Sequence, residues 1–236
     1  MQLFFNSNIT ENTQQVTFDK EESRHIVRVL RKKEGDILYI TNGSNFLFDV
    51  EIIIANDKKC VTKVINCKEI NSNRNYYLHV AIAPTKNIDR FEWFLEKAVE
   101  IGIDEITPII CKNSERKVVK PERLIKIIQS AMKQSLQFKL PKLNEATHFS
   151  DFIQQNFTGE LFIAHCEDDT SKNVLKNVAS LNSQYTILIG PEGDFSHDEI
   201  EKSFKNNFTP ISLGDNRLRT ETAGITCVQY ISFLHQ

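Results

Sequence analysis

The stretch YTILIGPEGDFSHDEI, residues 185–200, decides how the second half of this chain folds. Its first five residues predict a buried strand, because a short apolar run bounded by turn residues is typical of a parallel sheet. Gly190 and Gly193 then predict a loop. Ser196, followed three residues later by Glu199, forms a capping box that begins a helix. In open α/β sheets, ligands bind outside the carboxyl ends of strands, where a loop of this kind lies.

A second glycine-marked loop follows the next predicted strand, residues 208–213. This strand ends in Gly214 and continues as DNRLRTET, residues 215–222. We expect the two loops to lie at neighbouring strand ends and to form one pocket that holds its ligand mainly through backbone groups. The alternative for each loop alone is that its glycines serve as simple turn residues.

On both sides of this stretch, strands alternate with helices through the second part of the chain. Strands are predicted at 76–83, 103–110 and 160–166, and helices at 88–101, 121–138, 172–180, 198–206 and from about 222. Such alternation predicts an α/β fold, a parallel sheet with helices on both faces. Before the polar segment 69–75, β-rich runs at 37–40, 46–55 and 60–67 predict a small β-barrel or β-sheet domain. The predicted domains are therefore residues 1–72 and 73–236.

The charge of the chain is informative only when it is counted locally. Twenty-nine Lys and Arg against 31 Asp and Glu give a net charge of −2, which as a total argues against a nucleic-acid partner. Residues 24–33 nevertheless hold five cations and no acid, and residues 112–142 carry a net +7, while residues 143–209 carry −7. Two basic runs predict an RNA-binding surface. The alternative is that each run is a solvated face.

Several classes of protein are excluded by missing motifs. The chain has no GxxxxGK[ST], no GxGxxG, no HExxH and no GxSxG, which argues against a P-loop hydrolase, a dinucleotide enzyme, a zinc protease and a serine hydrolase. Its five cysteines contain no CxxC pair, so no metal site is expected. No signal peptide or long apolar segment is evident, which together with reduced thiols predicts a cytoplasmic protein.

The two loop segments resemble a known family. LIGPEGDFSHDEI (188–200) and SLGDNRLRTETAGI (212–225) are similar to the motifs of the RsmE-type 16S rRNA (uridine-N3)-methyltransferases of the SPOUT superfamily. Weaker similarity covers HIVRVLRKKEGD (25–36) and EKAVEIGIDEITPIICKNSER (96–116), in the same order. The resemblance implies a PUA-like RNA-binding β-domain followed by a SPOUT domain, in which the chain forms a deep trefoil knot.

The resemblance also implies an activity and a set of ligands. The expected enzyme is a homodimer that uses S-adenosyl-L-methionine to methylate N3 of one uridine in small-subunit rRNA, within the assembled 30S subunit. Carried over to matching positions, the expected cofactor contacts are Gly190, Glu192, Gly193, Leu213, Gly214, Leu218, Arg219 and Thr220. One departure is visible: where the family pattern has Glu and Arg, this chain has Lys133 and Gln137, although Lys133 and Lys139 keep the segment cationic.

The chemistry asks for two further groups. Uridine N3 is a poor nucleophile until its proton leaves, so the enzyme must stabilise the uridine anion or remove the proton. We expect Arg219 to stabilise the anion and Glu221 to act as base or orienting group; the alternative is that the two side chains pair with each other or cap the last helix. The residues expected to contact RNA phosphates are Arg24, Arg28, Arg31, Lys32, Lys33, Arg116, Lys117, Lys120 and Arg123.

Two other functions stay open on the sequence. One is a SPOUT methyltransferase that acts on another RNA, such as a tRNA. The other is an RNA-binding ribosome-assembly factor that has kept the fold and lost the chemistry, although the intact glycines and the LRTET segment argue against it. Binding of S-adenosylmethionine separates the enzymes from the binding protein.

Overall fold

A computed structural model of the chain describes residues 1–71, 74–167, 172–181 and 184–236. Packing divides it into two compact units. Unit 1 comprises Met1–Ser72 with Met132–Leu140, and unit 2 comprises Asn73–Ala131 with Pro141–Gln236. The predicted boundary between residues 72 and 73 falls on residues outside the described part of the chain. The segment Met132–Leu140, which the sequence places in the second domain, packs with unit 1 instead.

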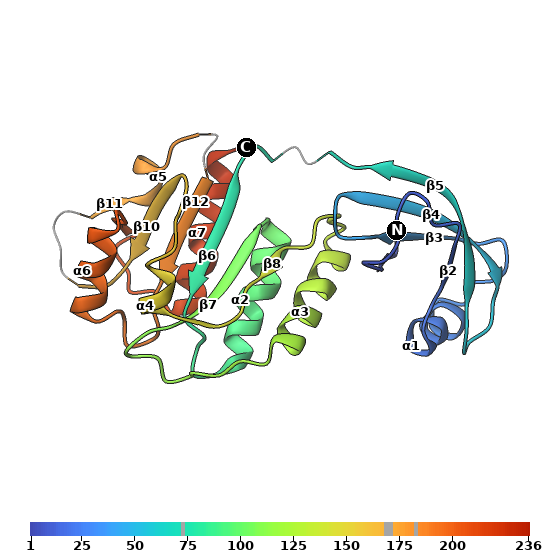
Figure 1. The fold of residues 1–236 in the computed structure, drawn as a ribbon, viewed down its shortest axis with the longest axis horizontal. Helices are drawn as coiled ribbons and strands as arrows, with labels where there is room; N and C mark the ends of the chain where they lie inside the picture. Colours follow the sequence, from blue (N-terminus) through green and yellow to red (C-terminus); the bar gives the residue numbers. More distant parts are fainter. Residues whose placement is uncertain (72–73, 168–171, 182–183) are drawn as a thin grey trace. The chain divides into compact units, whose positions relative to one another are not determined.

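Unit 1 is built on a five-stranded sheet (Figure 1). Its strands are β1 (Leu3–Phe5), β2 (Gln15–Thr17), β3 (Ile37–Thr41), β4 (Phe46–Ile54) and β5 (Val61–Glu69), in the order β1-β3-β4-β5-β2. The pair β1–β3 is parallel and the other pairs are antiparallel. A helix α1 (Lys20–Arg24) continues into a π-helical turn η1 (His25–Val29). The sequence prediction missed β1 and β2, because three-residue strands are too short for an alternating pattern.

The sheet of unit 1 curls around its own core. Phe4 of β1 and Phe18, which follows β2, belong to opposite edges of the sheet, yet their ring centroids are 5.4 Å apart. Both rings join a buried cluster with Ile26 and the β4 residues Phe48 and Val50. The two edges therefore approach each other, as in the small β-barrel architecture that the sequence predicts.

The segment Met132–Leu140 extends unit 1. The backbone N–H of Leu140 donates to the carbonyl of Gly43 at 2.8 Å, and Thr41 Oγ1 donates to the carbonyl of Phe138 at 3.1 Å. Gly43 has φ +76°, and a Cβ added there would lie 3.0 Å from Leu140 Cβ. The predicted helix 121–138 is consequently too long: α3 (Pro121–Gln134) ends where Leu136 adopts φ 56° and the chain turns to pair with the β3–β4 loop.

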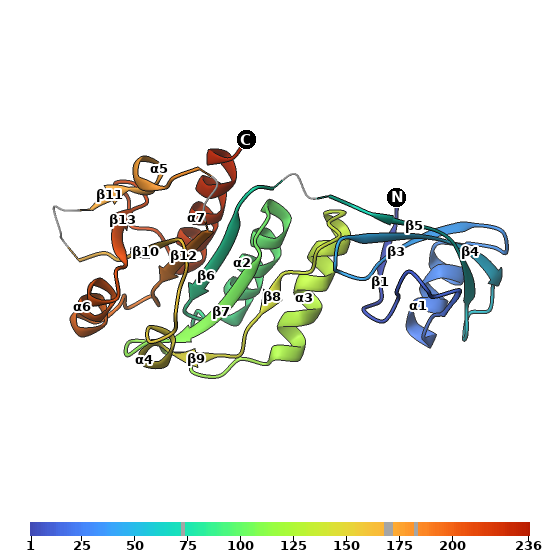
Figure 2. The same ribbon diagram turned by 45° about the horizontal axis from the view of Figure 1, so that its top comes forward.

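Unit 2 is a parallel α/β sheet, as predicted (Figures 1 and 2). Its strands are β6 (Tyr77–Ile82), β7 (Glu105–Ile110), β8 (Lys142–Leu143), β9 (Thr147–His148), β10 (Glu160–Ala164), β11 (Asn173–Val174), β12 (Gln184–Ile189) and β13 (Thr209–Ser212). The order is β11-β13-β10-β12-β6-β7-β8, with β9 also beside β7, and every described pair is parallel.

Both faces of this sheet are covered by helices. The helices are α2 (Ile88–Ile101), α3, α4 (Phe149–Phe152), α5 (Leu175–Val178), α6 (His197–Lys205) and α7 (Thr220–Leu234). Ala81 of β6 packs in one buried cluster with Phe152 of α4 and Ile200 of α6. The next residue, Ile82, points the other way: a Cβ added to Gly224 of α7 would lie 2.9 Å from it and 2.6 Å from Phe94 of α2. Successive residues of a strand point to opposite faces, so β6 is buried on both sides.

One predicted helix of unit 2 is wrong. Residues 172–180 contain the two-residue strand β11 and the four-residue helix α5 rather than one helix. Val174 pairs with Ser212 at the edge of the sheet, so pairing with β13 overrides the local preference for a helix. The trefoil knot implied by the resemblance stays a prediction.

Candidate active site

The two glycine-marked loops follow β12 and β13, at the carboxyl ends of the strands. The sequence predicted that these two strands are neighbours. That prediction is wrong, because β10 lies between them. The loops nevertheless meet: Thr220 Oγ1 donates a hydrogen bond of 3.0 Å to the carbonyl of Gly190. This hydrogen bond joins the two loops directly, as expected if both contribute to one site. The end of β10 lies between them and also lines that site.

Two adjoining cavities, about 300 and about 430 Å³, lie where the loops meet. They share the lining residues Ala164, Cys166, Arg217, Leu218 and Ala223. The first cavity also includes the predicted residues Gly190, Glu192, Arg219 and Thr220. The second includes Leu213 and Gly214. Gly193 is placed in the same loop but is not among the described residues that line either cavity.

Sequence reasoning missed the contribution of β10. Ala164, His165 and Cys166 close the space between the two loops. No motif marks them, and only the strand order places them there. The one signal available was that β10, like its neighbours, is a buried strand that ends in a polar loop.

The first loop is held from several sides. Glu192 Oε1 accepts a 2.9 Å hydrogen bond from the backbone N–H of Lys86 in the loop after β6. Asn113 Nδ2, from the loop after β7, donates to the carbonyl of Gly193 at 3.0 Å. Gly190 leaves little room for a side chain, because an added Cβ would lie 3.0 Å from the Phe195 ring. The predicted capping box of Ser196 and Glu199 is present and begins α6.

The second loop is more exposed. Gly214 has φ +125°, a conformation that residues with a side chain rarely adopt. Arg219 is the exposed N-cap residue of α7. No ion pair joins it to Glu221 among the described residues, so the structure gives no support to the alternative in which these two side chains pair with each other.

Glu221 points away from the cavities. Its side chain is 9% exposed, and its Oε1 lies 3.8 Å from Nε of Arg90 on α2. Its Oε2 has no hydrogen-bond partner among the described residues. A buried carboxylate oxygen normally has a hydrogen-bond donor, so this one marks a place where a further group can bind.

The predicted RNA-binding residues divide into two kinds. Arg116 donates to the carbonyls of Thr85 and Lys86, and Arg123 pairs with Glu92, so both arginines brace unit 2 internally. The side chains of Lys117 and Lys120 are exposed and face solvent. In unit 1, Arg24, Arg31 and Lys33 are exposed, Lys32 is half-buried, and Arg28 pairs with Asp57 at 2.7 Å.

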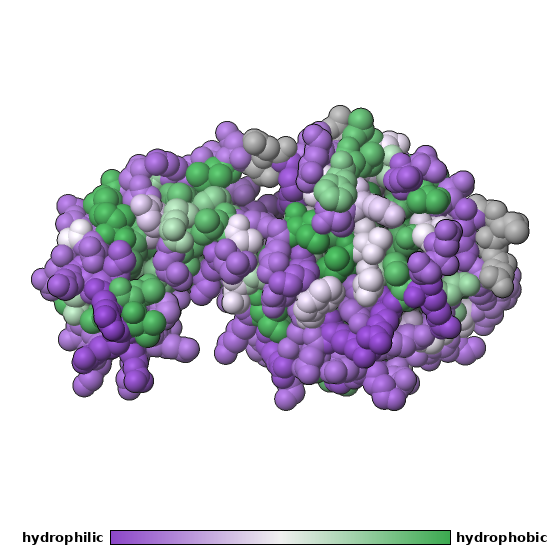
Figure 3. Space-filling view, turned by 180° about the vertical axis from the view of Figure 1, so that it is seen from behind, coloured by the Kyte–Doolittle hydropathy of each residue, from purple (hydrophilic) through white to green (hydrophobic). Residues whose placement is uncertain are grey.

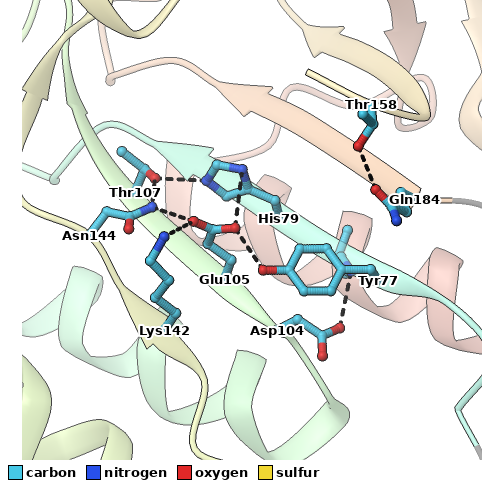
Figure 4. A network of polar contacts seen from close by, with 10 residues as sticks. Tyr77, His79, Asp104, Glu105, Thr107, Lys142, Asn144, Thr158 and Gln184 are labelled. Carbon is cyan, nitrogen blue, oxygen red and sulfur yellow. Dashed lines mark hydrogen bonds and ion pairs between the residues drawn. The ribbon is translucent and has the colours of Figure 1, made fainter. Parts of the chain in front are cut away.

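A polar network occupies the opposite end of the same sheet (Figure 4). Glu105, the first residue of β7, accepts hydrogen bonds from Tyr77, Lys142 and Asn144 at 2.7, 2.9 and 2.7 Å. Burial alone would raise the pKa of Glu105, but these three hydrogen bonds outweigh it and hold the pKa at about 2. Burial lowers the pKa of His79, which contacts Thr107 at 2.7 Å, to about 4.

The cysteines and the possible metal ligands are the other residues with potential chemistry. All five cysteines are free, and burial raises the pKa of Cys111 and Cys227. Within the described ranges no three His, Cys, Asp or Glu side chains are grouped so that they could hold a metal ion. No helix in the described part of the chain is long and apolar enough to cross a membrane.

Comparisons with known proteins identify the class. The family model of an RNA methyltransferase domain matches residues 72–232, and that of an RNA methyltransferase PUA domain matches residues 18–65. A PUA-type β-unit and a parallel sheet with a loop-lined cavity therefore define an RNA methyltransferase fold of two domains.

The relatives narrow this class to a family. The ribosomal RNA small subunit methyltransferase E of Rickettsia conorii is 31% identical over 98% of this chain and 95% of its own length. A Porphyromonas gingivalis structure described as a "probable rRNA-methyltransferase" is 38% identical, with a TM-score of 0.91 over 100% of this chain and 98% of its own. A Legionella pneumophila methyltransferase structure containing bound SAM is 27% identical, with a TM-score of 0.87 over 98% and 96%. The chain belongs to the ribosomal RNA small subunit methyltransferase E family.

Proposed function

We propose that this protein transfers a methyl group from S-adenosyl-L-methionine to N3 of one uridine in small-subunit (16S) rRNA, within the assembled 30S subunit. The observation that carries the proposal is the pair of adjoining cavities formed where the Gly190–Gly193 loop meets the LRTET segment. The activity is that named for the relatives, and the atom methylated is the one implied by the family resemblance.

The cavities suit this methyl donor. Together they have the size of a typical small-molecule site. Ile189, Leu213 and Leu218 provide apolar wall suited to an adenine ring, and Gly190 and Gly214 leave backbone groups accessible. The carboxylate of Glu192 provides negative charge for a ligand that carries a sulfonium and an amino group.

The protein's own residues supply the rest of the chemistry. Bound S-adenosylmethionine supplies an electrophilic methyl group on sulfonium. Arg219, exposed at the cavity rim, places a permanent positive charge where a uridine carbonyl oxygen would gain charge as N3 loses its proton. Glu221, whose Oε1 lies 3.8 Å from Nε of Arg90, provides a buried carboxylate two residues further on. Because it points away from the cavities, its proposed role is to orient a neighbouring group rather than to take the N3 proton.

We propose that RNA phosphates bind the exposed cations. Lys117 and Lys120 serve in unit 2, and Arg24, Arg31 and Lys33 in unit 1, with Lys32 and Arg28 contributing less because one is half-buried and the other is paired. Arg116 and Arg123 stay committed to unit 2. Phosphate contacts of this kind position the substrate and weaken with rising salt.

We also propose that the protein acts as a homodimer in the cytoplasm, where small ribosomal subunits are found. Helix α7 is apolar around most of its circumference, so its outer face needs a cover. Phe233 of α7 is 62% exposed and Trp93 of the adjacent α2 is 46% exposed. Figure 3 shows apolar and weakly polar residues interrupting the hydrophilic surface over these helices.

The deciding experiment maps the methyl group. The protein is incubated with labelled S-adenosylmethionine and small subunits that lack the modification, with Arg219→Ala as the matched negative control. We expect label at N3 of a single uridine in small-subunit rRNA. Label in tRNA would move the assignment to another RNA, and absence of both labelling and cofactor binding would leave an RNA-binding assembly factor.

The dimer has a separate test. Light scattering should give about twice the chain mass of 27.2 kDa, and Phe233→Asp should shift the protein toward monomer. A wild-type monomer at micromolar concentration would contradict the dimer without affecting the methylation proposal.

A further inference from the structure

Asp194 is an unusual residue in the wall of the first cavity. It follows Gly193 in the first loop and has φ 61°, in the left-handed region that side chains other than those of Asn and Asp strongly disfavour. Its backbone N–H donates to the carbonyl of Pro191 at 2.9 Å and closes a tight turn over Glu192 and Gly193. A non-glycine residue in this conformation persists only where its surroundings hold it.

The carboxylate of Asp194 provides that hold. Its Oδ2 accepts a 2.7 Å hydrogen bond from the backbone N–H of Cys166, just beyond β10. Its Oδ1 accepts a 2.8 Å hydrogen bond from the backbone N–H of Phe195. One side chain therefore ties the loop after β12 to the end of the neighbouring strand. Hydrogen bonds from backbone N–H groups to an ionised carboxylate are among the stronger ones in proteins.

A second tie reaches the same turn from the other side. Asn113 Nδ2 donates to the carbonyls of Gly193 and Asp194, at 3.0 and 3.1 Å. Asn113 lies after β7 and Cys166 after β10, so the turn is held from both directions across the sheet. Cys166 lines both cavities, and it lines the first together with Gly190 and Glu192 of the same loop as Asp194.

We propose that Asp194 is a positioning residue for the methyl donor. It fixes the first loop against Cys166, so the cavity is formed before the ligand arrives and no binding free energy is spent on ordering the loop. The inference rests on the proposed function, because it assumes that S-adenosylmethionine occupies these cavities. It assigns Asp194 no contact with the reacting atoms.

Three substitutions separate the carboxylate from the backbone conformation. Asp194→Gly relieves the left-handed strain and removes both side-chain hydrogen bonds. Asp194→Ala removes the same bonds and keeps the strain. Asp194→Asn tolerates the conformation and keeps one acceptor oxygen. The control is Asp198→Asn, an exposed acid four residues further on that lines neither cavity.

The readouts are calorimetric dissociation constants for S-adenosylmethionine and S-adenosylhomocysteine, the melting temperature, and the kinetic constants on the small subunit. For Asp194→Gly we expect wild-type thermal stability, an approximately tenfold rise in both dissociation constants and in KM for the donor, and kcat within about threefold. Asp194→Ala should show the same weakening with a lower melting temperature. Asp194→Asn should fall between Asp194→Gly and the wild type, and Asp198→Asn should bind like the wild type.

Each other outcome has a defined meaning. Wild-type affinity in Asp194→Gly would overturn the positioning role. Weakening confined to the cationic S-adenosylmethionine would also overturn it, because it would show attraction by charge rather than a preformed cavity. A wild-type protein that binds neither ligand would instead contradict the proposed function.

Discussion

The two ends of the parallel sheet in unit 2 use polar residues in opposite ways. At the amino ends of β6 and β7, Tyr77, His79 and Glu105 contact each other or near neighbours, and all are buried or half-buried. At the carboxyl ends, Arg219 is exposed beside a cavity and Glu221 Oε2 lacks a partner among the described residues. The network at the amino ends satisfies its polar groups internally, whereas the carboxyl ends leave the exposed charge of Arg219 beside a cavity, where a ligand can reach it.

The two ends also differ in whether perturbed pKa values coincide with a cavity. The strongest pKa shifts of carboxylate and imidazole groups, those of Glu105 and His79, lie at the amino ends of the strands, away from the two adjoining cavities. Perturbed pKa values often mark active sites, but ion-pair networks perturb them too. In this protein the adjoining cavities and the exposed Arg219 point to the active site better than the pKa shifts do.

Arg219→Ala tests the candidate active site at the carboxyl ends of the strands and should give the largest effect. We expect kcat for rRNA methylation to fall about 10²- to 10³-fold, as happens when one electrostatic transition-state contact is removed. Because Arg219 is exposed, the melting temperature should stay near that of the wild type. Single-turnover methylation and thermal melting measure both quantities. Turnover close to the wild-type value would remove Arg219 from the mechanism.

The polar network of Tyr77, His79 and Glu105 at the amino ends of β6 and β7 should account for most of the loss of stability in acid. Glu105 has a pKa of about 2 in the folded protein against an ordinary 4.5, so its stabilising contribution is present above pH 4.5 and is lost as pH falls toward 2. His79 has a pKa of about 4 against 6.5, so its contribution is lost as pH falls from 6.5 to 4. Urea unfolding between pH 7 and 3 should show a loss of about 2–4 kcal/mol.

Glu105→Gln tests the same end directly. The substitution removes the charge that Lys142 pairs with and weakens the hydrogen bond from Tyr77, so we expect the free energy of unfolding to fall by about 1–3 kcal/mol. The acid sensitivity below pH 4.5 should diminish with it. Calorimetry should show unchanged affinity for S-adenosylmethionine. A large loss of cofactor affinity would break the division between the two ends.

The smallest expected effect is on RNA binding by the basic residues of the run 112–142. Lys120→Ala should weaken RNA binding a few-fold and lower the salt dependence of the association constant by about one phosphate contact. Arg116→Ala should leave that salt dependence unchanged and lower the melting temperature, because Arg116 braces the loop that holds Glu192. Binding to small-subunit RNA across a salt series, with melting curves, compares the two. If both substitutions lowered the salt dependence equally, Arg116 would contact RNA phosphates as Lys120 does.

The sequence alone determined the local elements and the chemistry of the loops. The helix Ile88–Ile101 and the capping box at Ser196 follow from patterns within a few residues. The glycines at 190 and 214 mark the loops that line the cavities: Gly190 is packed against Phe195, and Gly214 has a φ that residues with a side chain rarely adopt. The sequence prediction failed where pairing between distant segments determines the local structure. Examples are the short strand β11 and the early end of α3.

Tertiary structure alone decided which residues meet. The placement of β10 between β12 and β13 brought Cys166 into the site, and the same sheet order joined it to Asp194. It also gave Arg116 and Arg123 partners within unit 2, Thr85 and Glu92, which their positions in a basic run did not reveal; their predicted role in RNA binding stays a prediction. Strand order and side-chain partners depend on contacts between residues far apart in the chain, which no local pattern encodes.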